Sequence, residues 1–151
     1  MRKKMNKTLK TFMLWMFCFA IATSIYPVEQ QGIIKVTVRG FKSSTGTIKI
    51  GLYKSAQTFP KVEKQYKGKT VDAVGDEVRV AFTEIPLGEY AVAVFHDENS
   101  NGKLDENTIG IPQEAYGCSN GTRGVFGPPS FDDAKVTLRE NSSQELIINI
   151  K

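Results

Sequence analysis

The chain has 151 residues, of which 40% are hydrophobic, so it is long enough to bury the core of one domain. Residues 1–24 hold five lysine and arginine residues and no acidic residue, and the rest of the chain balances 15 basic against 16 acidic side chains. The formal charge of +4 therefore belongs to the N-terminus, and the remainder lacks the basic surface by which proteins bind nucleic acid or anionic membranes.

The N-terminal segment has the order of a secretory signal: basic residues, then an apolar run, then small residues. We expect residues 1–24 to be a signal peptide cleaved after Ala22 or Ser24, residues 25–32 a linker, and residues 33–151 the domain. The apolar run is shorter than the roughly 20 residues of a membrane span. The mature form is therefore expected to have no membrane span and to be periplasmic or extracellular, with a retained N-terminal anchor as the alternative.

Cysteine usage sets one constraint on stability. Cys18 lies in the expected signal peptide, which leaves Cys118 as the single cysteine of the mature chain. An internal disulfide cannot then form, so the core must supply the stability. Cys118 is either a buried small apolar residue or a free thiol.

Apolar and polar residues alternate along several short segments, which is the pattern of half-buried β-strands. The segment at 90–95 is apolar on both sides and is expected to be a central strand. The first two strands are expected to pair as a hairpin, and residues 59–66 to form one or two helical turns with Phe59, Val62 and Tyr66 on one face. The expected strands are 34–38, 48–52, 78–82, 90–95, 136–138 and 146–150, with a weaker one at 70–74.

These elements predict an all-β fold: a single Greek-key β-sandwich of about seven strands, immunoglobulin-like in type. The inward residues of the strands, Val80 among them, are expected to form its core. Residues 97–133 show no lasting period, but they contain aromatic residues that can bury surface. They are expected to form one long ordered loop rather than a disordered segment.

The start of this loop has the spacing of a calcium-binding loop. Asp97, Asn99, Asn101 and Asp105 place side-chain oxygens at loop positions 1, 3, 5 and 9, and a glycine stands at position 6. Hard oxygen ligands favour calcium over zinc or copper. The pattern lacks the glutamate at position 12, where Thr108 stands, so Asx turns without a metal are the alternative.

A second motif, Gly117-Cys118-Ser119-Asn120-Gly121, has the spacing of a serine-hydrolase elbow. The elbow needs a strand before the serine and a helix after it, and neither flank has that pattern. The only histidine, His96, precedes the serine, whereas the hydrolase order places it afterwards. We therefore expect Ser119 and Asn120 to cap a turn, His96 to fix the loop by a hydrogen bond, and the protein to be non-enzymatic.

Several motifs together are similar to a family of secreted bacterial proteins catalogued as domain of unknown function 2141. The resemblance spans nearly the whole chain after the signal and implies a transthyretin-like sandwich, without implying an activity. Cys118 departs from the aromatic residue expected there. The motifs are Gly88-Glu89-Tyr90-Ala91-Val92, His96-Asp97-Glu98-Asn99, Asn101-Gly102-Lys103-Leu104-Asp105, Gly110-Ile111-Pro112, Tyr116-Gly117, Ser119-Asn120 and Phe126-Gly127-Pro128-Pro129-Ser130-Phe131-Asp132-Asp133-Ala134.

The sequence thus predicts an exported, non-enzymatic binding module stabilised by calcium, whose partner is an envelope protein or a glycan. The alternative is a carbohydrate-binding module in which aromatic rings of the long loop stack on sugar. The same rings could instead anchor the loop itself. A hydrolase is the least favoured class. The expected ligand surface comprises His96, Tyr116, Ser119, Asn120, Phe126 and Phe131.

Overall fold

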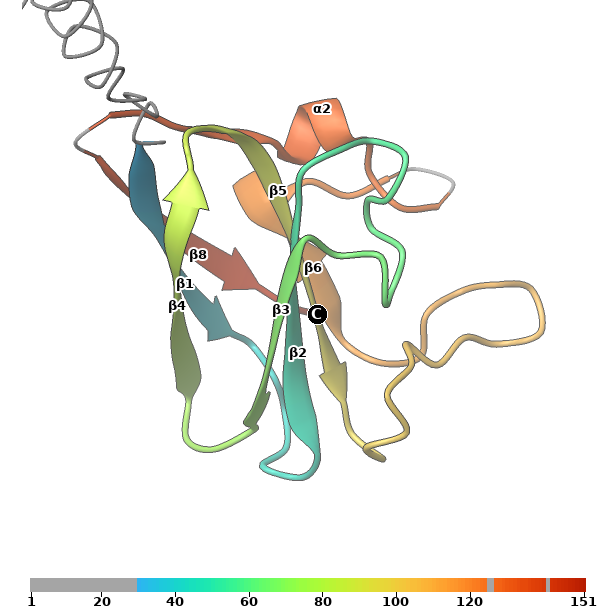
Figure 1. Cartoon of the computed structure of the whole chain (residues 1–151). Helices are drawn as coiled ribbons and strands as arrows, with labels where there is room; N and C mark the ends of the chain where they lie inside the picture. Colours follow the sequence, from blue (N-terminus) through green and yellow to red (C-terminus); the bar gives the residue numbers. More distant parts are fainter. Residues whose placement is uncertain (1–29, 125–126, 141) are drawn as a thin grey trace, which may run out of the picture.

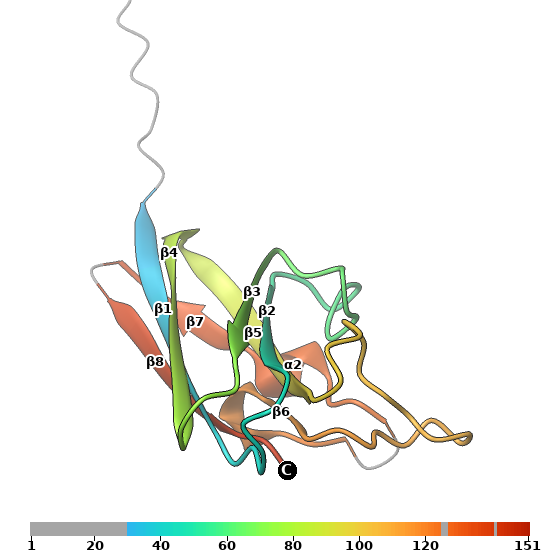
Figure 2. The same ribbon diagram turned by 90° about the horizontal axis from the view of Figure 1, so that it is seen from below.

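The computed structural model describes residues 30–124, 127–140 and 142–151. Two β-sheets pack face to face, as Figures 1 and 2 show from two directions. The first has the strand order β4-β1-β8, and the second has the order β3-β2-β5-β6, with β7 also paired to β5. The elements are β1 (Gln31–Arg39), β2 (Thr47–Tyr53), β3 (Lys67–Asp72), β4 (Glu77–Pro86), β5 (Gly88–Asp97), β6 (Tyr116–Cys118), η1 (Ser119–Gly121), α2 (Phe131–Ala134), β7 (Val136–Leu138) and β8 (Ser143–Asn149).

The predicted all-β sandwich is therefore confirmed, while its Greek-key order and transthyretin-like type stay predictions. The alternating residues of β1, β2 and β5 meet between the two sheets and bury one another. Strand β5 is largely buried on both faces, as its apolar sequence predicts, and it lies between β2 and β6 in the sheet. The core includes Ile34, Val36, Val38, Ile48, Ile50, Leu52, Tyr90, Val92, Leu138 and Ile148.

The predicted hairpin of the first two strands is wrong. Strand β1 pairs antiparallel with β4 and parallel with β8, while β2 pairs with β3 and β5 in the other sheet. The chain crosses between the sheets after Gly40 and before Gly46, which take φ of +93° and +74°. Alternation predicts which residues of a strand face the core. The inward residues of β1 and β2 do meet in one core, but they reach it from opposite sheets.

Two smaller expectations also need correction. Residues 59–66 form turns rather than a helix, and their side chains diverge: Phe59 is buried, whereas Val62 and Tyr66 are 39% and 42% exposed. Phe59 instead packs edge-on against Tyr53, with the ring centroids 5.3 Å apart. Val80 is half-buried and packs at the margin of the core, because β4 is an edge strand of its sheet.

The long segment after Asp97 contains more structure than expected. Strand β6 pairs with β5, and η1 and α2 follow it. Among the described residues, no helix is long and apolar enough to cross a membrane. The expected signal peptide, residues 1–24, lies outside the described residues.

Candidate binding groove and the adjoining Asp97 loop

A row of small side chains crosses the outer face of the second sheet. The register places Gly51 of β2 beside Gly68 of β3 on one side and Ala93 of β5 on the other, and Cys118 of β6 stands next to Ala93. Because residues in register share a face of the sheet, these four positions form one continuous line. A row without bulky side chains leaves a trough in the surface.

Larger side chains border this trough on both sides. Lys49, Phe95 and Tyr116 are partners in register and form the neighbouring row across β2, β5 and β6. On the other side the Tyr53 ring lies over Gly51: a Cβ atom at Gly51 would lie 2.8 Å from the ring carbon Cε2 of Tyr53. Glycine at position 51 is therefore needed for this arrangement.

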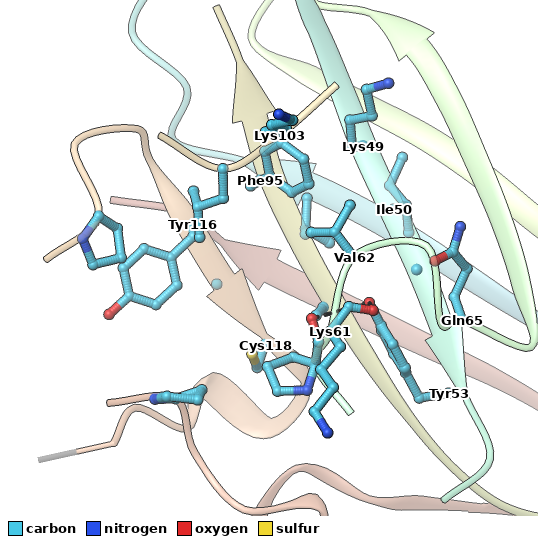
Figure 3. Close-up of a pocket in the computed structure, with 18 of the residues that line it drawn as sticks. Lys49, Ile50, Tyr53, Lys61, Val62, Gln65, Phe95, Lys103, Tyr116 and Cys118 are labelled. Atoms are coloured by element: carbon cyan, nitrogen blue, oxygen red, sulfur yellow. Dashed lines mark hydrogen bonds between the residues drawn. The ribbon is translucent and has the colours of Figure 1, made fainter. Parts of the chain in front are cut away.

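Three loops raise walls around the trough and turn it into a groove of about 990 Å³. That volume lies at the upper end of the range for small-molecule sites. One wall comes from Pro60 to Gln65, the second from Lys103 to Pro112, and the third from residues that flank the segment 125–126. Figure 3 shows Val62 over the middle of the groove, with Tyr116 on one side and Gln65 on the other.

The deep end of the groove is uncharged at neutral pH. Burial raises the pKa of the Cys118 thiol to about 11, against a weaker opposing effect of Arg123. Burial, followed by the nearby Cys118, raises the pKa of Tyr53 to about 12. The Tyr53 hydroxyl donates to the carbonyl oxygens of Pro60 and Lys61, each 3.2 Å away, and so ties one wall to the floor.

Residues 97–105, here called the Asp97 loop, run into the wall that begins at Lys103. The loop starts at a buried carboxylate. Asp97 is fully buried; its Oδ1 accepts from the Asn101 N–H and its Oδ2 from the Gly102 N–H, both at 2.9 Å. Gly102 takes the positive φ, +82°, that the glycine position of the motif requires. Lys49 Nζ stands 3.7 Å from Asp97 Oδ2 and partly neutralises it.

The four predicted metal ligands do converge, and they already bind one another. Asn99 Nδ2 donates to Asp105 Oδ2 at 2.7 Å, and Asn101 Nδ2 donates to Asp105 Oδ1 at 2.9 Å. The two amide oxygens accept from the backbone N–H groups of Asn101 and Lys103, as Asx turns do. A cation at this place would compete with both amides for the Asp105 carboxylate.

Glu114 holds the loop from outside the motif, and no pattern in the sequence predicts this role. Its Oε1 accepts from the Glu98 N–H and its Oε2 from the Asp105 N–H, both at 3.0 Å. Within the described residues, no group of three or more His, Cys, Asp or Glu side chains is placed to hold a metal. Any cation in the loop would depend on the two Asn side chains as well as on Asp97 and Asp105.

Two residues of the expected ligand surface, His96 and Ser119, are fully buried and cannot meet a ligand. His96 Nε2 lies 2.7 Å from the carbonyl oxygen of Thr45, an acceptor, so this nitrogen carries the proton. Ser119 Oγ donates to the Ala134 carbonyl oxygen at 2.5 Å and accepts from the Val92 N–H at 2.9 Å. Both side chains therefore fix the backbone, as expected of a turn and a strand end.

The other four residues of the expected ligand surface do not lie together at one site. The Asn120 amide donates to the carbonyl oxygens of Asp133 and Lys135 and joins η1 to the end of α2. Phe131 is half-buried and packs edge-on against Phe59, with centroids 6.1 Å apart, so it anchors the loops. Phe126 lies outside the described residues. Among the described members of this set, only Tyr116 lines the groove.

The groove itself was missed by sequence reasoning, although one signal was present. Gly51 lies in the middle of an otherwise regular strand, where glycine often marks the close approach of a ligand or of another group. Its partners Ala93 and Cys118 could be found only once the register between three strands was known.

Comparison with known proteins yields one family. A family model described as an uncharacterized protein conserved in bacteria (DUF2141) matches residues 36–146. The chain belongs to this family. It is the family that the sequence motifs resemble, and its description names no activity. No curated protein and no solved structure matches the chain.

Proposed function

We propose that this member of the DUF2141 family is an exported, non-enzymatic module that binds a small ligand in the groove over β2, β5 and β6. The observation that carries the proposal is the groove of about 990 Å³, whose floor is a row of small, uncharged residues. Such a floor offers contact area without a pair of carboxylates, and burial raises the pKa of its Cys118 thiol to about 11, so that the thiol keeps its proton at neutral pH. Ser119, the serine of the elbow motif, has its hydroxyl bonded to backbone groups instead of His96.

Calcium has a supporting part in this proposal. The Asp97 loop includes Lys103 and Leu104, which line the groove. A cation held by Asp97, Asn99, Asn101 and Asp105 would therefore order one wall of the ligand site. Only two of these four residues carry charge, so the affinity should be modest, roughly 0.1–1 mM.

The test is binding of an uncharged apolar probe, N-phenyl-1-naphthylamine, followed by its fluorescence. Ala93→Phe should abolish binding, because Ala93 points outward from the middle of the floor and a phenyl ring fills the trough. Val74→Phe is the matched control, since Val74 is exposed and does not line the groove. Equal binding by wild type and by folded Ala93→Phe would contradict the proposed site.

A carbohydrate ligand is the second candidate, and Tyr116 favours it because its ring lines the groove. The guanidinium of Arg123 stands 5.6 Å from that ring centroid and could hydrogen-bond to sugar hydroxyls. Titration with cellotetraose distinguishes the two: binding that Tyr116→Ala removes would support the carbohydrate reading, and its absence would leave the apolar ligand.

A further inference from the structure

We propose that the ligand of the groove is an amphiphilic anion, an apolar body carrying one acidic group, and that Lys49 and Lys103 bind the acidic group. The inference rests on the proposed function, because it takes the groove to be the ligand site. It adds the chemical class of the ligand and its orientation.

The first observation is that one end of the groove is cationic. Lys49 is the register partner of Phe95, and Figure 3 shows Lys49 and Lys103 at the Phe95 end of the groove. A Cβ atom at Gly102 would lie 3.9 Å from Lys49 Nζ, so this ammonium group lies beside the residue that precedes Lys103. Two lysine side chains at one end of the groove favour a negative group at that end.

The state of these two lysines supports this role. The Lys49 side chain is 30% exposed, and its contact with Asp97 is long, at 3.7 Å. The Asp97 carboxylate is fully buried and already accepts two backbone hydrogen bonds, so Lys49 is not its only partner. Lys103 is exposed and has no ion pair within the part of the chain that the structure describes. Both groups can therefore take up an acidic ligand.

The second observation is that the floor of the groove and parts of its walls are apolar. The floor is the row of small residues with the neutral Cys118 thiol at its end, and Tyr116 stands at its side. Val62 and Ile111 line the walls and are 39% and 54% exposed, so a ligand would cover apolar surface that now faces water. An apolar body in the trough and an acidic group at the Phe95 end match both parts at once.

The other charged residues that line the groove favour a ligand with one acidic group. Lys61 donates to the Gln57 carbonyl oxygen at 3.0 Å, a closer contact than the 3.7 Å between Lys49 and Asp97, and the Lys69 ammonium stands 6.0 Å from the Phe82 ring centroid. Glu106 is the one carboxylate among the described residues that line the groove. The Glu106 carboxylate repels a second negative group near the wall formed by Lys103 to Pro112.

The experiment compares two fluorescent probes with the same aromatic body in the mature chain. 8-Anilinonaphthalene-1-sulfonate carries a sulfonate, and N-phenyl-1-naphthylamine is the same body without it. We expect the sulfonate probe to bind more tightly, and Lys103→Met and Lys49→Met to weaken it by about two- to fivefold each, the range of a partly exposed ion pair. Neither change should shift the affinity of the uncharged probe by more than about twofold, because methionine keeps the apolar stem. Added salt should weaken the sulfonate probe alone.

Lys64→Met is the matched control, because Lys64 is an exposed lysine in the wall of residues 60–65 but does not line the groove. If the Lys49→Met variant unfolds because it loses the contact with Asp97, the Lys103→Met variant still decides the test. Equal affinities for the two probes, with no effect of Lys103→Met, would overturn the inference and leave the proposed function standing. Binding of the sulfonate probe that survives Ala93→Phe would also overturn it. Failure of the folded protein to bind either probe would overturn the proposed function together with the inference.

Discussion

At the scale of single residues, burial decides the chemistry of the groove floor. Cys118 is 3% exposed, and burial raises the pKa of its thiol from 9.0 to about 11. A thiol with a raised pKa is a poor nucleophile at neutral pH. The sequence left open whether Cys118 is a small apolar residue or a reactive thiol, and its surroundings favour the first. Those surroundings come from Tyr53, Phe59 and Ala134, which no local pattern could bring together.

The raised pKa of Cys118 predicts how stability depends on alkaline pH. The unfolded thiol loses its proton near pH 9 and the folded one near pH 11, so the unfolded state binds fewer protons between these values. The contribution of Cys118 to stability should be complete below pH 9 and decline between pH 9 and 11, by about 2–3 kcal/mol in total. Urea denaturation of wild type and Cys118→Ala under reducing conditions at pH 8 and pH 11 measures it. Parallel losses in the two proteins would show that the thiol is not responsible.

At the scale of elements, the Asp97 loop was the part that sequence reasoning could best anticipate. Its residues are near neighbours in the chain, and their spacing alone brings Asn99 and Asn101 to Asp105. Strand pairing was less accessible, because alternation tells which face of a strand is buried and not which strand lies beside it. The parallel pairing of β1 with β8 joins residues more than 100 positions apart, and the hairpin expectation failed for that reason.

The loop gives a prediction about calcium. Calcium at a hundredfold excess over its dissociation constant should stabilise the folded state by about 2.7 kcal/mol. Asp105→Asn should remove this response, and Asp76→Asn, an exposed change in another turn, should retain it. Asp97→Ala should lower stability with or without calcium, because the buried carboxylate accepts two backbone N–H groups. Calorimetric scans with chelator and then with calcium at this hundredfold excess decide this, and superimposed wild-type transitions would mean that Asx turns alone hold the loop.

At the scale of the whole molecule, the two sheets have different outer faces. The outer face of the first sheet carries ion pairs such as Lys35–Glu145 and Arg39–Glu77, whereas loops enclose a groove on the second. The two-sheet fold could be predicted from strand periodicity. The groove could not, because it needs the register of β2, β5 and β6 and the path of three loops over them.

Export is a prediction for the whole chain. If residues 1–24 are a signal peptide, the exported protein should begin at Thr23 or Ile25, because the basic and apolar regions end before these residues. Mass spectrometry of the protein recovered from the periplasm or medium gives its first residue. An intact Met1 on membrane-bound protein would favour the retained anchor.

The most direct test of the central claim is an amide NMR titration of the mature chain with N-phenyl-1-naphthylamine. We expect the shifts to centre on Gly51, Ala93 and Cys118, with further shifts at the groove walls. The competing apolar surface is the outer face of the first sheet, where Ile33 and Ile147 are 37% and 59% exposed. Shifts confined to that face, or scattered over both faces without saturation, would contradict the assignment of the groove as the ligand site.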